Sequence, residues 1–243
     1  MISELPLHSL GLIGGMSWQS TQTYYARINQ GVHEQRGGNH SAPLWLYSFN
    51  FAEIEALQAE GQWDQAGQRM ADIARRLEDA GAQGLVICTN TMHKLSDYVT
   101  DATQIPLLHI VDATADAIKA SRAQKPVLLA TQYTMTQDFY RGPLAEKLAA
   151  DNCRLYVPPP AARETVHNII YHELCQGIIQ PHSRQAYLDI IDDAVAGAGC
   201  DSVILGCTEI GLLIGQKDTN VPIFDTTALH CDMAIDFICG NSR

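Results

Sequence analysis

The sequence predicts an α/β protein in which parallel strands form two similar halves of one 243-residue chain. Short apolar runs alternate with amphipathic stretches along the whole chain, and several of these runs end abruptly in Gly, Ser, Thr or Asn. In addition, segments of the first half recur in the second half at a constant spacing. Alternating strand and helix signals are typical of parallel sheets that are covered by helices.

The apolar runs have the length of buried strands, and the amphipathic stretches have the length of helices. The expected strands cover residues 9–13, 44–47, 85–88, 127–130, 155–157, 203–205 and 223–224. The expected helices include residues 20–33, 63–80, 114–121, 137–151, 163–176 and 184–198. Two of these helices stop beside Gly81 and Gly199, and glycine commonly follows the last turn of a helix.

An internal repeat relates the two halves of the sequence. Residues 84–92 (GLVICTNTM) match residues 202–210 (SVILGCTEI) at an offset of 118, and residues 10–17 resemble residues 127–134 at an offset close to 117. The Ile105-Pro106 and Val221-Pro222 pairs lead to similar Asp-x-Thr segments at nearly the same spacing. We therefore expect one half to comprise residues 1–112 with 226–243, and the other to comprise residues 113–225.

Composition and charge exclude several classes of protein. The chain has 16 Lys and Arg against 27 Asp and Glu, a net charge of −11, so it lacks the basic surface that nucleic acid requires. Its apolar runs are about half the ~20 residues of a membrane span, and its N-terminus lacks a signal-like segment. We expect a cytoplasmic protein that binds neither nucleic acid nor membrane. Seven cysteines without a CxxC pair make a disulfide framework or a zinc site improbable.

Cys207 is the principal candidate for catalysis. It directly follows the apolar run that ends at Gly206 and precedes Thr208 and Glu209. A strand-end loop with free backbone N–H groups favours a thiolate, whereas the simpler interpretation is a buried structural thiol. Its equivalent in the repeat is Thr89. If the two halves face each other, these strand ends meet in one cleft, with Thr89 opposite Cys207.

Other strand-end side chains are candidates for binding a small polar ligand. Asn90, Thr91, Thr131, Thr134 and Thr208 offer hydrogen bonds without a fixed charge, although helix capping explains such residues equally well. Cys88 should point away from Thr89, because adjacent extended residues face opposite sides of a sheet. We therefore expect Cys88 to be structural.

The sequence contains no recognisable cofactor site. The glycines of residues 10–17 follow the spacing G-x-x-G-G, which fits neither a dinucleotide fingerprint nor a phosphate-binding P-loop. Lys94 is the lysine near a strand end, and it offers no clear position for a pyridoxal Schiff base. His93 has no second metal ligand near it in the sequence. We expect no cofactor and no metal.

Five segments together resemble the aspartate/glutamate racemase family, in the family's order, from residue 11 to residue 227. They are Gly11-Leu-Ile-Gly-Gly-Met-Ser-Trp18, Cys88-Thr-Asn-Thr-Met-His93, Tyr133-Thr-Met135 with Asp138-Phe-Tyr140, Gly206-Cys-Thr-Glu-Ile210 and Phe224-Asp-Thr-Thr227. The resemblance implies two similar flavodoxin-like domains, an active site in the cleft between them, and a homodimer. It also implies cofactor-independent proton transfer at an amino-acid Cα, with one cysteine on each face of the substrate.

The sequence departs from that two-cysteine pattern, because Thr89 replaces the first cysteine. The second cysteine of the family deprotonates the L-enantiomer, so the resemblance assigns Cys207 to L-substrates and Thr89, or a water that it positions, to the opposite face. Glu209 completes the catalytic set. Such a site must stabilise a carbanion electrostatically and exclude water.

The resemblance also implies that Met16, Ser17, Asn50 and Arg163 bind substrate. Relatives often carry Asp at the position of Asn50 and a basic residue near Thr165. Arg163 is a plausible partner for a substrate carboxylate, and its simpler interpretation is a solvated arginine at a helix start. Aspartate, glutamate or a broader set of amino acids therefore remain open as substrates.

Two other functions remain open. One is a decarboxylase similar to arylmalonate decarboxylase, which keeps the second-half cysteine alone and would use Cys207 to protonate a carbanion. The other is a non-catalytic amino-acid binding protein that has lost one catalytic thiol. The Gly-Gly-Met-Ser-Trp segment favours the racemase.

Overall fold

The computed structural model describes residues 6–241 and divides the chain into two compact units. Unit 1 runs to His109 and resumes at His230, and unit 2 comprises Ile110–Leu229. The unit boundaries thus lie three and four residues from the positions expected at 112/113 and 225/226. The second boundary falls inside helix α11 (Thr226–Cys239). Unit 2 is therefore one uninterrupted segment of the chain, whereas unit 1 consists of two.

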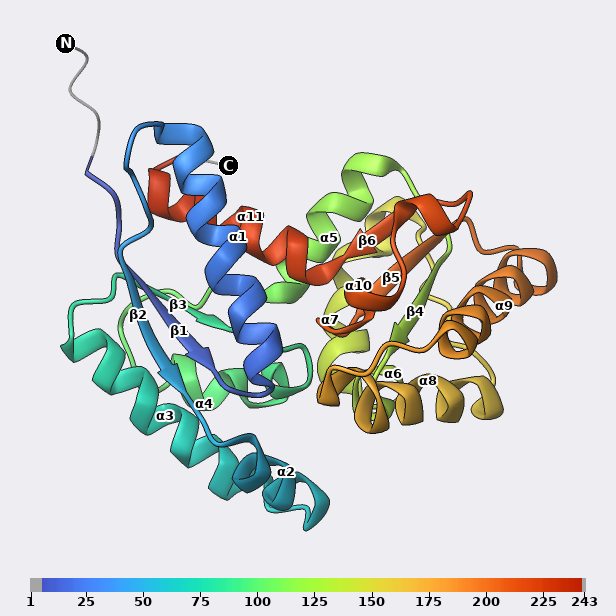
Figure 1. Ribbon diagram of the computed structural model, residues 1–243, viewed down its shortest axis with the longest axis horizontal. Helices are drawn as coiled ribbons and strands as arrows, with labels where there is room; N and C mark the ends of the chain where they lie inside the picture. The colour runs from blue at the N-terminus through green and yellow to red at the C-terminus, as the bar shows by residue number, and fades with distance from the viewer. Residues whose placement is uncertain (1–5, 242–243) are drawn as a thin grey trace. The chain divides into compact units, whose positions relative to one another are not determined.

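Unit 1 contains a parallel sheet in the order β2-β1-β3 (Figure 1). The strands are β1 (Leu10–Gly14), β2 (Leu44–Ser48) and β3 (Gly84–Ile87). Leu107 extends the sheet by an isolated parallel bridge to Leu85. The first strand is therefore central, and β2 forms one edge.

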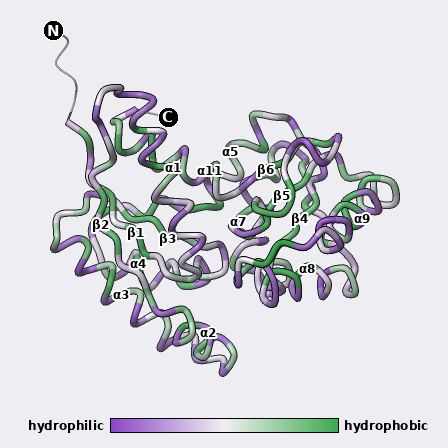
Figure 2. The backbone as a smooth tube through the Cα atoms, in the orientation of Figure 1, coloured by the Kyte–Doolittle hydropathy of each residue, from purple (hydrophilic) through white to green (hydrophobic). Residues whose placement is uncertain are grey.

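Helices cover both faces of this sheet. They are α1 (Trp18–Arg36), α2 (Phe51–Ala59), α3 (Trp63–Asp79), the 3₁₀ turn η1 (Thr91–Leu95), α4 (Ser96–Thr100) and the part of α11 from His230 onward. Alternate residues of a strand face opposite sides. Accordingly, Leu10 and Leu12 pack with α1 and α11, whereas Ile13 packs with α2 and α3. Figure 2 shows these strands as hydrophobic segments.

Unit 2 repeats this arrangement with a parallel sheet in the order β4-β5-β6. The strands are β4 (Pro126–Ala130), β5 (Ser202–Gly206) and β6 (Ile223–Asp225), and Tyr156 bridges to Val127 on the outer side of β4. The helices are α5 (Ile110–Ser121), α6 (Gln132–Thr136), α7 (Asp138–Leu148), η2 (Ala149–Asp151), α8 (Pro160–His172), η3 (Leu174–Gln176), α9 (Pro181–Ala198), α10 (Ile210–Leu213) and η4 (Gln216–Asp218).

The two sheets share one connectivity, which confirms the predicted two-part α/β fold. In unit 1, β1 pairs with β3 on one side and with β2 on the other. In unit 2, β4 pairs with β5 on one side and with the extended segment at Tyr156 on the other. The repeated segments at 84 and 202 begin the equivalent strands β3 and β5. The predicted extent of the strand at residues 155–157 was wrong, because this segment forms only the isolated bridge at Tyr156. The three prolines that follow, residues 158–160, have no N–H groups to extend a ladder.

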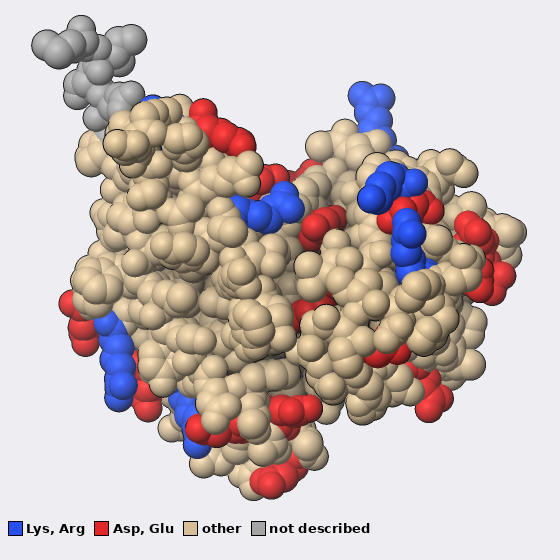
Figure 3. Space-filling view, in the orientation of Figure 1, with Lys and Arg blue, Asp and Glu red and all other residues tan. Residues whose placement is uncertain are grey.

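Two surface properties bear on possible partners. No helix within residues 6–241 combines the length and the apolar character needed to cross a membrane. On the face drawn in Figure 3, lysines and arginines are scattered among acidic residues and form no continuous basic surface. The visible charge pattern therefore does not resemble a nucleic-acid-binding surface.

Candidate active-site residues

Most of the candidate residues lie at the carboxyl ends of the two sheets. In unit 1, Ile13 of β1 pairs with Ile87 of β3, and Gly14 pairs with Ser48 of β2. The residues that follow these strands therefore emerge at one edge of the sheet. This edge carries Met16, Ser17, Asn50, Thr89, Asn90 and Thr91.

Thr89 directly follows Cys88 at the end of β3, and its main chain is held on both sides. Its N–H donates to the carbonyl of Ile87 at 2.8 Å, and its carbonyl accepts from His93 Nδ1 at 2.8 Å. The residue is 9% exposed. Its hydroxyl makes no hydrogen bond to any other residue in the range 6–241. That hydroxyl is consequently available to a small molecule.

Cys88 is a core residue, as predicted. Its side chain packs with Leu10, Leu12 and Cys231 in the core beneath α1 and α11. Burial raises the pKa of this thiol well above its ordinary value, and Cys231 adds to the effect. The carbonyl of Cys88 accepts a hydrogen bond from Ser20 Oγ at 2.7 Å, which fixes the strand end to α1. Cys88 is therefore an inert structural thiol.

The other unit 1 candidates have different surroundings. Ser17 is the N-cap of α1 and accepts a hydrogen bond from the N–H of Ser20, so part of its role is structural. Met16 is 4% exposed and packs in the core beside α2 and α3. Asn90 and Thr91 are buried next to Thr89.

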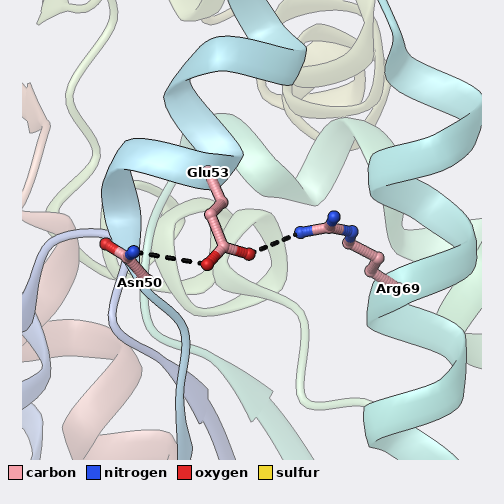
Figure 4. Close-up of polar contacts among 3 residues, drawn as sticks. All are labelled: Asn50, Glu53 and Arg69. Atoms are coloured by element: carbon pink, nitrogen blue, oxygen red, sulfur yellow. Dashed lines mark hydrogen bonds and ion pairs between the residues drawn. The ribbon is translucent and has the colours of Figure 1, made fainter.

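Asn50 departs from this group because its side chain is exposed. Its amide donates to Glu53 Oε1 at 3.3 Å, and Glu53 Oε2 pairs with Arg69 at 2.9 Å (Figure 4). These three side chains form an exposed link between the loop after β2 and α3. Asn50 is thus engaged in a surface network, whereas Thr89 and its neighbours are buried.

In unit 2, Cys207 and Glu209 form a hydrogen-bonded pair. Cys207 follows β5, and its Sγ donates to Glu209 Oε2 at 3.0 Å. The hydroxyl of Thr208 donates to the same oxygen at 2.5 Å. The pair is almost completely buried, with Cys207 8% and Glu209 3% exposed. The carboxylate is positioned to receive the thiol proton.

This environment holds Cys207 as a thiol. Burial raises its pKa well above the ordinary value, and the charge of Glu209 raises it further. The backbone N–H of Glu209 lowers the pKa but is outweighed. The expectation that the strand-end position favours a thiolate was therefore wrong. The carboxylate of Glu209 is the acceptor in contact with this thiol.

Thr131 occupies the position beside Cys207, because Ala130 and Gly206 are paired in the sheet. It is the N-cap of α6, and its Oγ1 accepts from the N–H of Thr134 at 3.4 Å. The two threonine hydroxyls lie 3.2 Å apart. The capping interpretation is thus correct for Thr131. Its position directly after β4 also places its hydroxyl at the carboxyl edge of the sheet.

Arg163 lies in the first turn of α8 and is partly buried. Its Nε is buried and has no hydrogen-bond partner within the described part of the chain. Buried polar atoms are normally satisfied, so a carboxylate ligand is a suitable partner for this group. Thr165, by contrast, is exposed and donates to the carbonyl of Ala161 at 3.1 Å.

The sequence does not indicate that Tyr187, on α9, interacts electrostatically with Cys207. This tyrosine is fully buried, and its hydroxyl donates to the carbonyl of Val166 at 3.1 Å. Burial raises its pKa well above the ordinary value, and Cys207 contributes to the rise. The stripe Ser183, Tyr187, Ile191 and Ala194 has the spacing of a buried helix face, so the sequence predicts only a core residue.

Comparison with known proteins identifies the family. The model of the Asp/Glu/hydantoin racemase family matches residues 13–234. The chain belongs to this family. It is therefore an isomerase of the racemase type, as predicted.

Similar proteins match nearly the whole chain. The broad specificity amino-acid racemase RacX of Bacillus subtilis (strain 168) is 24% identical over 226 residues, covering 90% of this chain and 93% of RacX. The crystal structure of a candidate Asp/Glu racemase from Yersinia pestis is 50% identical with a TM-score of 0.87, covering 96% and 99%. An aspartate racemase homologue from Pyrococcus horikoshii OT3 is 31% identical with a TM-score of 0.81 and the same coverage.

Proposed function

We propose that this racemase moves the Cα proton of an amino acid without a cofactor, with Cys207 as the base for L-substrates. The observation that carries the proposal is the 3.0 Å hydrogen bond from Cys207 to Glu209. Glu209 accepts the thiol proton, and the resulting thiolate removes the α-proton of the substrate. Thr89, or a water that it positions, then supplies a proton to the opposite face of the carbanion.

We propose aspartate and glutamate as substrates, within a set that can extend to other amino acids. The buried Nε of Arg163 supports an acidic side chain, because a carboxylate would satisfy it. RacX, which is similar over most of its length, is a broad specificity enzyme, and this supports the wider set. Thr131, Thr134, Asn90 and Thr91 would bind the polar groups of the substrate.

The test is exchange of the Cα proton in D₂O. The protein is incubated separately with L-aspartate, L-glutamate and neutral L-amino acids, and chiral chromatography over all twenty amino acids then defines the range. Deuterium at Cα together with formation of the D-enantiomer supports the proposal. Binding without exchange would instead support a non-catalytic amino-acid binding protein.

Two cysteine variants provide a matched pair. Cys207→Ser should abolish exchange while the fold and ligand binding persist, because an alcohol is a far weaker acid than a thiol. Cys88→Ser should retain exchange and lower stability by about 1–3 kcal/mol, since it buries a hydroxyl in an apolar core. Near-native exchange by Cys207→Ser would exclude Cys207 as the base.

The proposed absence of a cofactor is tested separately. Activity should persist after exhaustive dialysis against a chelator and after treatment with hydroxylamine, which removes pyridoxal phosphate. Recovery that depends on added metal or pyridoxal phosphate would contradict this part of the proposal.

We also propose a homodimer, which analytical ultracentrifugation would distinguish from a monomer.

A further inference from the structure

Three histidine rings gather in unit 1, of which those of His93 and His230 are buried and that of His109 is half-buried. The ring centroid of His93 lies 4.6 Å from that of His109 and 5.6 Å from that of His230. His93 is 2% exposed and His230 is fully buried. They come from η1, from the end of the first segment of unit 1, and from α11. Within residues 6–241, no three His, Cys, Asp or Glu side chains are arranged to hold a metal ion, so the cluster needs another explanation.

Hydrogen bonds define the tautomer of His230. Its Nε2 lies 2.7 Å from the carbonyl of Leu108, and a carbonyl can only accept, so Nε2 carries the proton. In a neutral ring Nδ1 is then an acceptor, and the buried hydroxyl of Tyr24 donates to it at 2.8 Å. Both ring nitrogens of His230 are therefore engaged, with Tyr24 and with the carbonyl of Leu108.

His93 has the opposite tautomer. Its Nδ1 lies 2.8 Å from the carbonyl of Thr89, so the proton resides on Nδ1. Burial lowers the pKa of His93 well below its ordinary value, and His109 and His230 lower it further. The ring is consequently neutral, with one proton. Its main-chain contacts are with Thr89, to whose carbonyl Nδ1 donates, and with Asn90.

The Thr89 loop depends on such side-chain contacts. The sheet ladder ends where the N–H of Cys88 donates to Ile13. Beyond that point, the next two carbonyls are held by side chains: that of Cys88 by Ser20 and that of Thr89 by His93. A residue that merely filled the core would be apolar, because burying an imidazole is costly unless its N–H groups are bonded.

We propose that His93 is a positioning residue for the reaction, holding Thr89 in place through its Nδ1 hydrogen bond to the Thr89 carbonyl. The inference rests on the proposed function of Thr89 as the partner of Cys207. His93 itself does not touch the reacting atoms. Burial keeps the ring neutral, and the neighbouring rings of His109 and His230 contribute to this.

The test compares three variants. His93→Leu removes the donor and keeps an apolar side chain, whereas the amide of His93→Asn can donate near the position of Nδ1. Tyr24→Phe is the matched control, because it removes a hydrogen bond from the same cluster without touching Thr89. Starting from an L-substrate in D₂O, deuterium in the remaining L-enantiomer reports Cys207, and formation of the D-enantiomer reports Thr89 as well.

The inference predicts a specific change in the ratio of these two rates. His93→Leu should lower D-enantiomer formation relative to L-exchange by about tenfold or more, since small displacements of catalytic groups are costly. His93→Asn should recover most of the ratio, and Tyr24→Phe should leave it unchanged. An equal fall in both rates in His93→Leu would indicate a purely structural role and overturn the inference.

A second measurement does not depend on activity. Nitrogen-15 NMR of the histidine rings should show the proton of His93 on Nδ1 and that of His230 on Nε2 at pH 7. Amide hydrogen exchange at residues 89–91 should be faster in His93→Leu and near wild type in His93→Asn. A proton on Nε2 of His93, or unchanged exchange in His93→Leu, would overturn the inference. If the wild type racemises no amino acid, the proposed function fails, and these measurements still decide whether His93 holds the loop.

Discussion

The thiol of Cys207 and the carboxylate of Glu209 share a hydrogen bond of 3.0 Å at the end of β5. They are two residues apart, and the hydroxyl of Thr208 between them donates to the same carboxylate oxygen. In this arrangement the proton resides on the sulfur of Cys207, and the carboxylate of Glu209 accepts a hydrogen bond from it. Burial and the charge of Glu209 both raise the pKa of this cysteine.

The first prediction concerns the pH dependence of alkylation at Cys207. Because its pKa is raised, the rate of reaction with iodoacetamide should keep rising with pH beyond the ordinary range of a cysteine. Glu209→Gln removes a negative charge, so the pKa should fall and the rate near neutral pH should rise about 3- to 10-fold. Glu209→Asp keeps the charge and should retain the high midpoint. Mass spectrometry of the Cys207 peptide provides the readout.

The second prediction concerns the direction of catalysis. An alcohol is much less acidic than a thiol, so it is far less readily deprotonated to act as a base. Each unit of difference in pKa corresponds to about 1.4 kcal/mol. The wild type should therefore process L-substrates much faster than D-substrates, although the final mixture is racemic. Thr89→Cys should raise exchange from the D-enantiomer selectively, whereas Thr89→Ser should preserve the asymmetry. Initial rates from each enantiomer in D₂O measure the ratio, and equal wild-type efficiencies would exclude the proposed asymmetry.

The third prediction concerns the turn after β1. Gly15 has φ of +82°, and a Cβ there would lie 2.3 Å from the N and O atoms of Phe49. Gly15→Ala should destabilise the protein by about 3 kcal/mol or more, because backbone conformation and space both oppose it. Gly37 has φ of +70° with nothing within 4 Å of a Cβ, so Gly37→Ala should cost only about 1 kcal/mol. Urea denaturation of both variants separates strain from steric conflict.

The fourth prediction links His93 to the pH dependence of stability. Its pKa in the folded protein lies well below the value of about 6.5 in an unfolded chain. As the pH falls below about 6.5, the unfolded state binds a proton that the folded state does not, so the free energy of unfolding decreases by up to about 1.4 kcal/mol per pH unit. The contribution of neutral His93 to the free energy of unfolding is complete above about pH 6.5. The loss of stability below that pH should be absent from His93→Leu. Identical pH slopes for wild type and variant would contradict it.

Most strands could be predicted from sequence because each is a short apolar run with a clear end. Helices α2 and α11 were not predicted, since both have a high apolar content and their polar residues are not clearly separated onto one face. Helix α5 begins at Ile110, whereas a start at residue 114 was expected, because Ile110 and Val111 have the character of strand residues.

The candidate site was predictable only in part. The positions of Thr89, Thr131 and Cys207 follow from the rule that ligands bind beyond the carboxyl ends of parallel strands. The state of Cys207 does not follow from its position, because its pKa depends on burial and on the orientation of Glu209. The contact of His93 with Thr89 has the i, i+4 spacing of a single turn, but the sequence does not show that both are buried.

The division of unit 1 into two segments has a consequence for synthesis on the ribosome. Leu10, Leu12 and Val86 pack against Cys231 and Ile238 of α11, which is synthesised after every other element that the structure describes. Unit 2 is complete in sequence at Leu229, so it can fold before the rest of α11 emerges, although unit 1 starts earlier in the chain. During that interval one apolar face of the first sheet lacks its final cover. The nascent chain therefore exposes this apolar face until α11 has been synthesised, and we expect chaperones to bind it in that interval.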